Sequence, residues 1–420
     1  MISKLLKPVF DIHPEERLKT FLMFLYFFFT IALIYILKPV RNALVITELG
    51  AQNLRFVYMG EGIFLIFVVW GYLQMAKRVS KKMLYDAGLI FFIACLVGFW
   101  FLFRGKAPYL SAYFYIWVAA FSITMTTQFW TLANDIFTPD EGKRLFGVMI
   151  SSGSIGGILG GFFTAHAVQW FKAEDLLLVA AAVVGICLVI VNLLWKQVPN
   201  LEKPAIQSPS HKLAEESGLS SLKIFLGSPY FMMLAGLVMI SKMASTIIDN
   251  QFSSIVELAI SGKEARTAFF GGFLAWLNIL SFLMQFAMTG FCLQHLGVGR
   301  SLVILPVGLA IMLVPSLWLP LLATAIPLRL FDGSVNYSIQ QASKEILYLP
   351  VSSEKRYRVK PIIDMLGFRL AKTMAGVYIA IAAPLFAIPH ERLGILVFCL
   401  IPFWAALVWW VNKECRKLSL

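Results

Sequence analysis

Charged residues are scarce in this sequence. Of its 420 residues, 14% are Asp, Glu, Lys or Arg and 59% are hydrophobic, which gives a mean hydropathy of +0.78. Soluble domains carry about 25% charged residues, so this composition excludes an ordinary soluble protein. The hydrophobic residues form long uninterrupted runs, and a helix needs a run of about 20 to cross ~30 Å of hydrocarbon. The composition therefore predicts an all-α integral membrane protein.

Residues that bind metals or perform catalysis are also few and dispersed. The five cysteines and five histidines show neither metal-ligand spacing nor a disulfide framework. The glycine-rich stretch from Gly153 to Gly161 lacks the Gly-Lys-Ser/Thr ending of a phosphate-binding loop, and its GxxxG spacing favours close helix packing instead. The sequence contains no recognisable catalytic triad or carboxylate pair. We therefore expect no metal, no cofactor and no enzymatic activity.

Twelve hydrophobic runs are candidates for membrane spans, and a polar segment divides them six and six. They cover residues 18–48, 54–76, 83–103, 108–134, 145–170, 174–195, 228–257, 267–291, 301–315, 318–347, 361–387 and 393–411. We predict an N-terminal six-helix half (1–195), a cytoplasmic linker rich in Ser and Pro (196–223) and a C-terminal six-helix half (224–420).

The two halves resemble each other in sequence. Laying residues 36–45 against 247–256 places Lys38 opposite Asp249. Repeated halves with a substrate site between them are typical of the major-facilitator architecture. We expect about 12 transmembrane helices in this six-plus-six arrangement.

Lys and Arg are concentrated in alternate loops and at both ends of the chain. Cytoplasmic loops retain these residues, so both termini are expected in the cytoplasm, as an even number of spans requires. The same loops account for most of the net charge of +13, and we therefore expect no nucleic-acid binding. Charged residues before the first run, and the length of that run, do not fit a cleavable signal peptide. We expect a multi-pass protein of the bacterial inner membrane, in contact with the lipid bilayer; its oligomeric state is not predicted.

Ionisable residues inside the spans are candidates for function, because burying a charge in hydrocarbon costs about 3 kcal/mol or more. Lys38 and Arg41 lie one helical turn apart in the first span, which contains Pro39. They line a cavity or, alternatively, extend toward the membrane interface.

The tenth span carries two polar stripes. Arg329, Asp332 and Asn336 lie along one of them. The other consists of Tyr337, Gln340, Gln341, Lys344 and Tyr348. A helix that faces lipid does not tolerate such a row. Arg329 and Asp332 form an internal pair or contribute to a substrate site, and for Lys344 we favour a substrate role.

Further charges lie in the second, seventh and eleventh spans. They are Glu61, Lys242, Asp249, Asp364, Arg369 and Lys372. Asp364 could pair with Lys360, and Glu61 has no obvious partner. Together the spans carry an excess of three positive charges, which in a medium of low dielectric attracts anions. Lys and Arg both suit phosphate, so we expect a small anionic substrate.

Three groups of residues resemble motifs of the ATP/ADP translocase (nucleotide transporter) family. The first comprises Phe129, Trp130, Ala133, Asn134 and residues 140–144. The second, more specific, comprises Tyr337, Ser338, Lys344, Glu345, Tyr348, Pro350, Lys360, Asp364, Gly367 and Lys372. The third is residues 36–38 with Arg41, in which the family's Arg and Lys are exchanged, while Asp249 falls where the family carries a glutamate. Pro39, Asn42 and Tyr115 stand at or near places where the family has acids.

The resemblance implies a twelve-helix exchanger of nucleotides or related phosphates that works by alternating access without ATP hydrolysis. It implies substrate roles for Lys38, Arg41, Asp249 and Lys344. Together with the charges and amides above, the candidate substrate-binding residues are Lys38, Arg41, Asn134, Asp249, Arg329, Tyr337, Gln340, Gln341, Lys344, Arg369 and Lys372. The alternative is a proton- or sodium-coupled major-facilitator transporter of another organic anion, in which Glu61, Asp249 or Asp364 binds the coupling ion.

Overall fold

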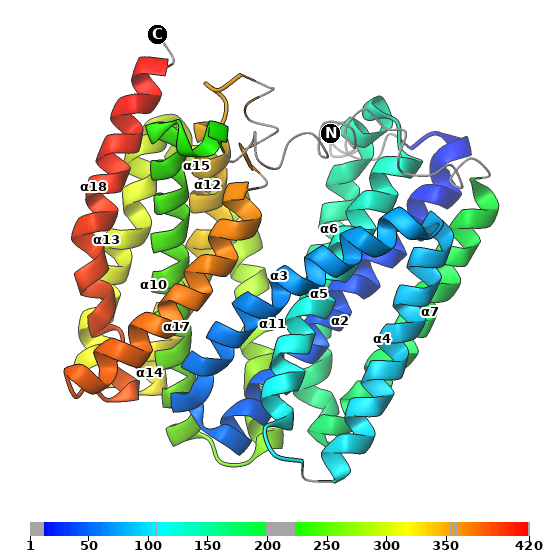
Figure 1. Ribbon diagram of the computed structural model, residues 1–420, viewed down its shortest axis with the longest axis horizontal. Coiled ribbons are helices and arrows are strands. Elements are labelled where there is room, and N and C mark those ends of the chain that lie inside the picture. Colours follow the sequence, from blue (N-terminus) through cyan, green and yellow to red (C-terminus); the bar gives the residue numbers. More distant parts are fainter. Residues whose placement is uncertain are drawn as a thin grey trace, which may run out of the picture. The chain divides into compact units, whose positions relative to one another are not determined.

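The helices lie where the hydropathy predicts them. In the computed structural model, residues 12–105, 107–198, 223–352, 355, 359–360 and 362–418 are described, and they form helices and turns without a strand (Figure 1). The helices of the first half are α2 (Arg17–Leu49), α3 (Leu54–Arg78), α4 (Lys81–Arg104), α5 (Leu110–Ile136), α6 (Pro139–Ala167) and α7 (Leu176–Gln197). Those of the second half are α10 (Pro229–Ala259), α11 (Lys263–Ala287), α12 (Thr289–His295), α13 (Gly297–Trp318), α14 (Leu322–Val335), α15 (Gln341–Leu347), α17 (Phe368–Leu385) and α18 (Ile395–Leu418).

Eleven helical segments within the described residues are long and apolar enough to cross a membrane. The tenth span in chain order, which brings the number to twelve, consists of α14, the π-helical turn η6 (Asn336–Gln340) and α15, which follow one another without a break. It differs from the others because the π-helical turn divides it into two shorter helices. A second π-helical turn, η7 (Ile362–Gly367), leads into α17. The prediction of an all-α protein with about 12 membrane helices is confirmed.

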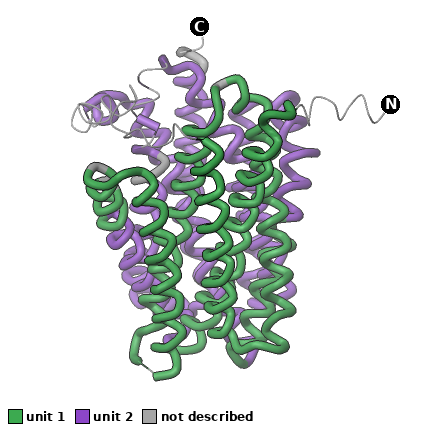
Figure 2. The backbone as a smooth tube through the Cα atoms, turned by 90° about the vertical axis from the view of Figure 1, so that its right-hand side faces the viewer, with its two compact units in different colours: residues 1–48, 67–207, 262–278 green, residues 49–66, 208–261, 279–420 purple. Residues whose placement is uncertain are grey.

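The chain forms two compact units (Figure 2), and the predicted division into two halves joined by a linker at 196–223 stays a prediction. Unit 1 comprises Met1–Glu48, Phe67–Gln207 and Gly262–Asn278. Unit 2 comprises Leu49–Ile66, Ser208–Ser261 and Ile279–Leu420. The start of α3 therefore belongs with the second unit, and the first half of α11 belongs with the first. The predicted linker (196–223) overlaps the last two residues of α7, which ends at Gln197; residues 199–222 lie outside the described residues.

In unit 1, the glycine-rich stretch of α6 packs closely against two other helices. A Cβ atom added at Gly160 would lie 2.6 Å from the backbone oxygen of Ala32 on α2. At Gly161 it would lie 2.8 Å from the backbone oxygen of Gly271 on α11. Only glycine permits such an approach, so the predicted role of the GxxxG spacing in helix packing is confirmed.

In unit 2, α10 is the central helix. It packs against α14, α17 and α18, and α13 packs against α14 and α18 (Figure 1). The start of α3 lies against α17, where a Cβ atom added at Gly376 would be 2.5 Å from the backbone oxygen of Arg55. This packing brings residues from α3, α10, α14 and α17 into one polar region.

Candidate functional site

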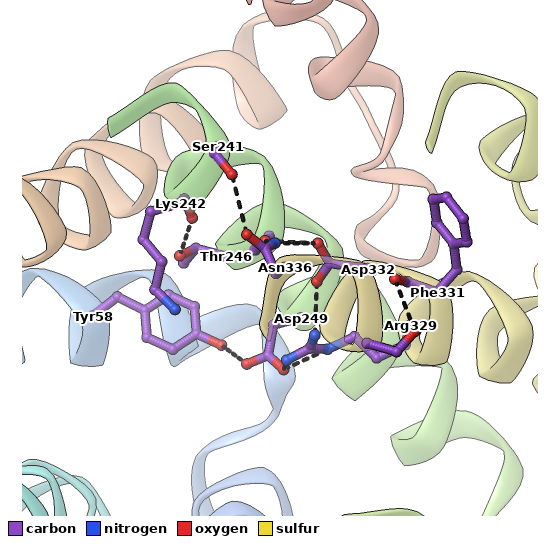
Figure 3. A network of polar contacts seen from close by, with 11 residues as sticks. Tyr58, Ser241, Lys242, Thr246, Asp249, Arg329, Phe331, Asp332 and Asn336 are labelled. Carbon is purple, nitrogen blue, oxygen red and sulfur yellow. Dashed lines mark hydrogen bonds and ion pairs between the residues drawn. The ribbon is translucent and has the colours of Figure 1, made fainter. Parts of the chain in front are cut away.

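One face of α10 carries polar side chains at four-residue intervals. Ser241, Ser245 and Asp249 are spaced so that they share one side of the helix. The neighbouring helix α14 contributes Arg329 and Asp332, one turn apart. Figure 3 shows that these side chains form a continuous hydrogen-bonded network.

Arg329 binds two carboxylates at once. Its Nε and Nη2 donate to Asp249 Oδ1 at 3.1 and 2.9 Å, and its Nη1 donates to Asp332 Oδ2 at 2.7 Å (Figure 3). The Arg329 side chain is 18% exposed, that of Asp249 28% and that of Asp332 1%. The internal pair that the spacing allowed is therefore present, and the same guanidinium also joins α14 to α10.

Neutral donors complete the surroundings of Asp332. Ser245 Oγ and Asn336 Nδ2 both donate to Asp332 Oδ1, at 2.6 and 3.1 Å respectively. Asn336 Nδ2 also donates to Ser245 Oγ, and Asn336 Oδ1 accepts a hydrogen bond from Ser241 Oγ. A buried charge is tolerated only when it is paired and hydrogen-bonded, and Asp332 meets both conditions. Asp332 therefore anchors the Arg329 side chain, whereas the more exposed Asp249 is the carboxylate that a ligand can approach.

Tyr58 connects this network to a second ion pair. Its hydroxyl donates to Asp249 Oδ2 at 3.2 Å, and the ammonium group of Lys372 lies over its ring, 4.8 Å from the centroid. Lys372 on α17 forms an ion pair with Glu61 on α3. Glu61, which has no obvious partner in the sequence, is thus neutralised by a residue 311 positions away. Charged and polar groups from α3, α10, α14 and α17 form one row.

Arg369 lies one turn before Lys372 on the same helix. It is 9% exposed, and its Nη1 donates to the backbone oxygen of Leu65 at 3.4 Å. Arg369 and Lys372 thus both contact the segment 61–65 of α3. Both basic residues predicted in this span are in the same region as the Asp249–Arg329 pair.

Lys344 is buried on α15 beside an aromatic ring. It is 6% exposed, and its ammonium nitrogen lies 5.2 Å from the centroid of the Phe368 ring on α17. Gln340, one turn earlier, is also buried, and its side-chain oxygen has no hydrogen-bond partner among the described residues. Such an oxygen is available to a hydroxyl or amino donor of a ligand.

The other two candidates on this span have different surroundings. Tyr337 is 59% exposed, and Gln341 Nε2 donates to Glu345 at 3.1 Å on an exposed face. Lys360, which the sequence places near Asp364, forms an ion pair with Glu345 at 2.6 Å. The side chain of Asp364 lies outside what the structure describes, so its predicted pairing stays a prediction.

Three candidates belong to unit 1. Arg41 is buried against α5: its guanidinium lies 4.1 Å from the centroid of the Tyr115 ring, and its Nη1 donates to the Tyr115 backbone oxygen at 3.4 Å. The ammonium group of Lys38 lies 5.0 Å from the centroid of the Tyr35 ring. Asn134 is exposed near the end of α5. The role of these three in substrate binding stays a prediction.

Tyr58, Ser245 and Phe368 were not predicted from the sequence. Asn336 was placed on a polar stripe of the tenth span but not among the candidate substrate-binding residues. The spacing of Ser241, Ser245 and Asp249 could have identified the polar face of α10. Nothing in the sequence indicates that Tyr58 or Phe368 contacts a lysine on another helix. Among the described residues, no group of three His, Cys, Asp or Glu side chains could hold a metal ion. The side chains of this region carry ammonium, guanidinium, carboxylate and amide groups, which are able to bind a charged ligand.

Comparisons with known proteins agree with these observations. The chain is 22% identical to ADP,ATP carrier protein 1 of Chlamydia trachomatis, over 88% of this chain and 83% of that protein. It is also 22% identical to ADP,ATP carrier protein 1 of Rickettsia bellii, over 99% of this chain and 97% of that protein. A chloroplastic ADP,ATP carrier protein of Arabidopsis thaliana is 22% identical over 90% of this chain and 72% of the relative.

Solved transporter structures share the fold. The nucleoside transporter NupG superposes with a TM-score of 0.65 at 15% identity, covering 96% of this chain and 99% of that one. A POT family transporter in complex with 5-aminolevulinic acid gives a TM-score of 0.65 at 12% identity, covering 96% and 97%. At such identities the likeness shows the fold alone, which is the predicted major-facilitator arrangement.

The sequence pattern of the family described as TLC ATP/ADP transporter matches residues 109–322, half of the chain. This match covers α5, which carries most of the first motif group, and the chain from there through α13. Together with the full-length relatives and the twelve-helix fold, it identifies the family. This multi-pass membrane protein belongs to the TLC ATP/ADP transporter family.

Proposed function

We propose that this chain exchanges nucleotides such as ATP and ADP across a membrane by alternating access. The observation that carries the proposal is the buried set of basic residues in unit 2, in a chain whose relatives are ADP,ATP carriers. Arg329 and Lys344 come from the span formed by α14 and α15, and Arg369 and Lys372 come from α17. A charged phosphate chain needs such groups to replace its hydration.

Asp249 and Arg329 provide a way to bind and release phosphate. Arg329 is held on one side by the buried Asp332, and on the other side by Asp249, which is 28% exposed. A phosphate oxygen presents the same chemistry to a guanidinium as a carboxylate oxygen does. In this proposal the substrate phosphate replaces Asp249 on Arg329, and Asp249 takes Arg329 back when the substrate leaves, so that the cation is never left uncompensated.

The proposal extends to the remaining candidates. Lys344 is a phosphate ligand, Gln340 accepts a hydrogen bond from the sugar or base, and Arg369 and Lys372 contribute positive potential. Lys38, Arg41 and Asn134, which belong to unit 1, stay candidate substrate-binding residues. Exchange is driven by the gradients of the two substrates and requires no hydrolysis. The Lys and Arg distribution supports a bacterial inner membrane location with both termini in the cytoplasm.

Counterflow tests this function. Proteoliposomes loaded with unlabelled ADP should accumulate labelled ATP, and empty vesicles should not. Lys344→Gln should abolish accumulation while the protein keeps its elution profile and melting temperature. Lys413→Gln, which removes a lysine lying 5.0 Å from the Trp409 ring centroid on α18, is the matched control and should behave as wild type.

The same vesicles test the alternative of ion-coupled transport. An imposed pH or sodium gradient should not drive uptake into vesicles that lack internal nucleotide. Uptake under those conditions would favour coupling through Glu61, Asp249 or Asp364 and would contradict exchange. Absence of counterflow for every nucleotide tested would refute the proposed function outright.

A further inference from the structure

Two lysines from different helices lie over a single aromatic ring in unit 2. The ammonium nitrogen of Lys344 on α15 is 5.2 Å from the centroid of the Phe368 ring, and that of Lys242 on α10 is 5.8 Å from it. Lys344 was expected at a substrate site from the motif that contains it. Lys242 and Phe368 were not, because no motif includes them and they are 126 positions apart in the sequence.

The placement of these three residues has a local structural cause. Lys344 follows the π-helical turn η6, and Phe368 directly follows the π-helical turn η7. A π-turn inserts an extra residue and rotates the helix that follows, and such turns occur frequently at functional sites. Helix α10 packs against both η7 and α17, which brings Lys242 to the ring.

Electrostatics indicate what this arrangement can bind. Two ammonium groups near one ring place positive charge in the same region, and the low dielectric of a membrane protein strengthens their attraction for an anion. A cation–π contact contributes about 0.5–2 kcal/mol, so the ring holds the ammonium groups in place without removing their capacity to bind an anion. An anion with several charged oxygens suits this arrangement, because each ammonium group can donate to an oxygen.

The same α10 face continues toward the carboxylate network. Lys242 precedes Asp249 by seven residues, two helical turns, so both lie on one side of α10 (Figure 3). Lys242 is partly exposed, and no carboxylate oxygen among the described residues lies within 4.0 Å of its ammonium nitrogen. Its ammonium group can therefore reach a ligand that also approaches Arg329.

From this geometry we infer that Lys242 and Lys344 bind the polyphosphate chain of the substrate, and that Phe368 positions their ammonium groups. The inference rests on the proposed function and specifies one part of it. The ring of Phe368 carries the two cations and does not stack on the nucleobase. Phe368 is therefore a positioning residue, and Lys242 is a substrate ligand.

Binding of three probes to the purified full-length protein tests this assignment. Inorganic tripolyphosphate carries only the phosphate chain, adenosine carries only the nucleoside, and ATP carries both. Lys242→Gln should weaken ATP and tripolyphosphate by about 10- to 100-fold, the range for losing a charge-assisted hydrogen bond. Adenosine binding should not change. Lys242→Arg should retain most of the affinity, and Lys413→Gln is the control that removes a lysine from a different aromatic ring.

Substitutions at Phe368 separate positioning from base stacking. Phe368→Leu should weaken tripolyphosphate and ATP by about 2- to 10-fold and leave adenosine unchanged, while Phe368→Tyr, which keeps the ring, should bind like wild type. A selective loss of adenosine in Phe368→Leu would overturn the assignment in favour of base stacking. Unchanged tripolyphosphate binding in Lys242→Gln would overturn it for Lys242.

These failures are distinct from failure of the proposed function. If wild-type protein exchanges nucleotides and Lys242→Gln does so with unaltered affinity, only the inference about Lys242 and Phe368 is refuted. If wild-type protein shows no nucleotide counterflow, the proposed function is refuted first and the inference with it.

Discussion

Replacing Arg329 by Gln should destabilise unit 2 substantially. The substitution removes the one cation among the described residues that pairs with Asp332, whose side chain is 1% exposed, and it also removes the ion-pair partner of Asp249. Breaking a buried ion pair by deleting one partner costs about 3–5 kcal/mol. Asp332 keeps its bonds from Ser245 and Asn336, and Asp249 is open enough to be hydrated, so we expect the lower end, about 3 kcal/mol.

Equilibrium unfolding in mixed detergent micelles, followed by tryptophan fluorescence, measures this loss. Adding Asp332→Asn to Arg329→Gln should recover about 2 kcal/mol, because the double variant no longer buries an unpaired charge. Lys143→Gln is the control: its pair with Asp140 leaves the two side chains 76% and 89% exposed, so its loss should be close to zero. Wild-type stability in Arg329→Gln, or further loss in the double variant, would refute the reasoning.

Three further outcomes follow from the packing and the ion pairs. Gly160→Ala should lower the free energy of unfolding by about 1–3 kcal/mol, because its Cβ would lie 2.6 Å from the Ala32 backbone oxygen. Gly185→Ala, with no described atom within 4 Å of its Cβ, should not lower it, and equal stabilities of the two variants would contradict the close packing of α6 on α2. Tyr58→Phe should lower the free energy of unfolding by about 1 kcal/mol, because it removes the hydrogen bond to Asp249 and keeps the ring under Lys372. A much larger loss in the same unfolding assay would indicate a role of Tyr58 beyond that hydrogen bond. Glu61→Gln should lower stability by about 3 kcal/mol, and adding Lys372→Met should recover part of it; independent, additive losses would show that the two side chains do not pair.

Hydropathy was sufficient to predict the membrane helices, because a span is a local property of about 20 consecutive residues. Hydropathy also located the tenth span, although that span carries Arg329, Asp332 and Lys344. It could not predict which helices pack together. Residues 49–66 and 262–278 belong to the compact unit built mainly from the other half of the sequence, and only side-chain contacts such as Gly161 with Gly271 specify this.

The charged residues were identified from sequence, but their partners were only partly predicted. The pair Arg329–Asp332 follows from helical spacing, since the residues are one turn apart. The pair Glu61–Lys372 joins residues 311 positions apart, and no local pattern contains it. Arg41 illustrates a different case: the sequence has Tyr115 near a place where the resembled family has an acid, and the Tyr115 ring and backbone oxygen contact the guanidinium.

Efflux of labelled ADP from proteoliposomes tests nucleotide exchange most directly. Vesicles containing the wild-type protein are loaded with labelled ADP, and unlabelled ATP is then added outside. The proposed function predicts rapid efflux that depends on external nucleotide, approaches one ADP released for each ATP taken up, and is unaffected when the pH gradient is collapsed. Efflux that proceeds equally without external nucleotide, or that stops when the pH gradient is collapsed, would contradict exchange as the function of this chain.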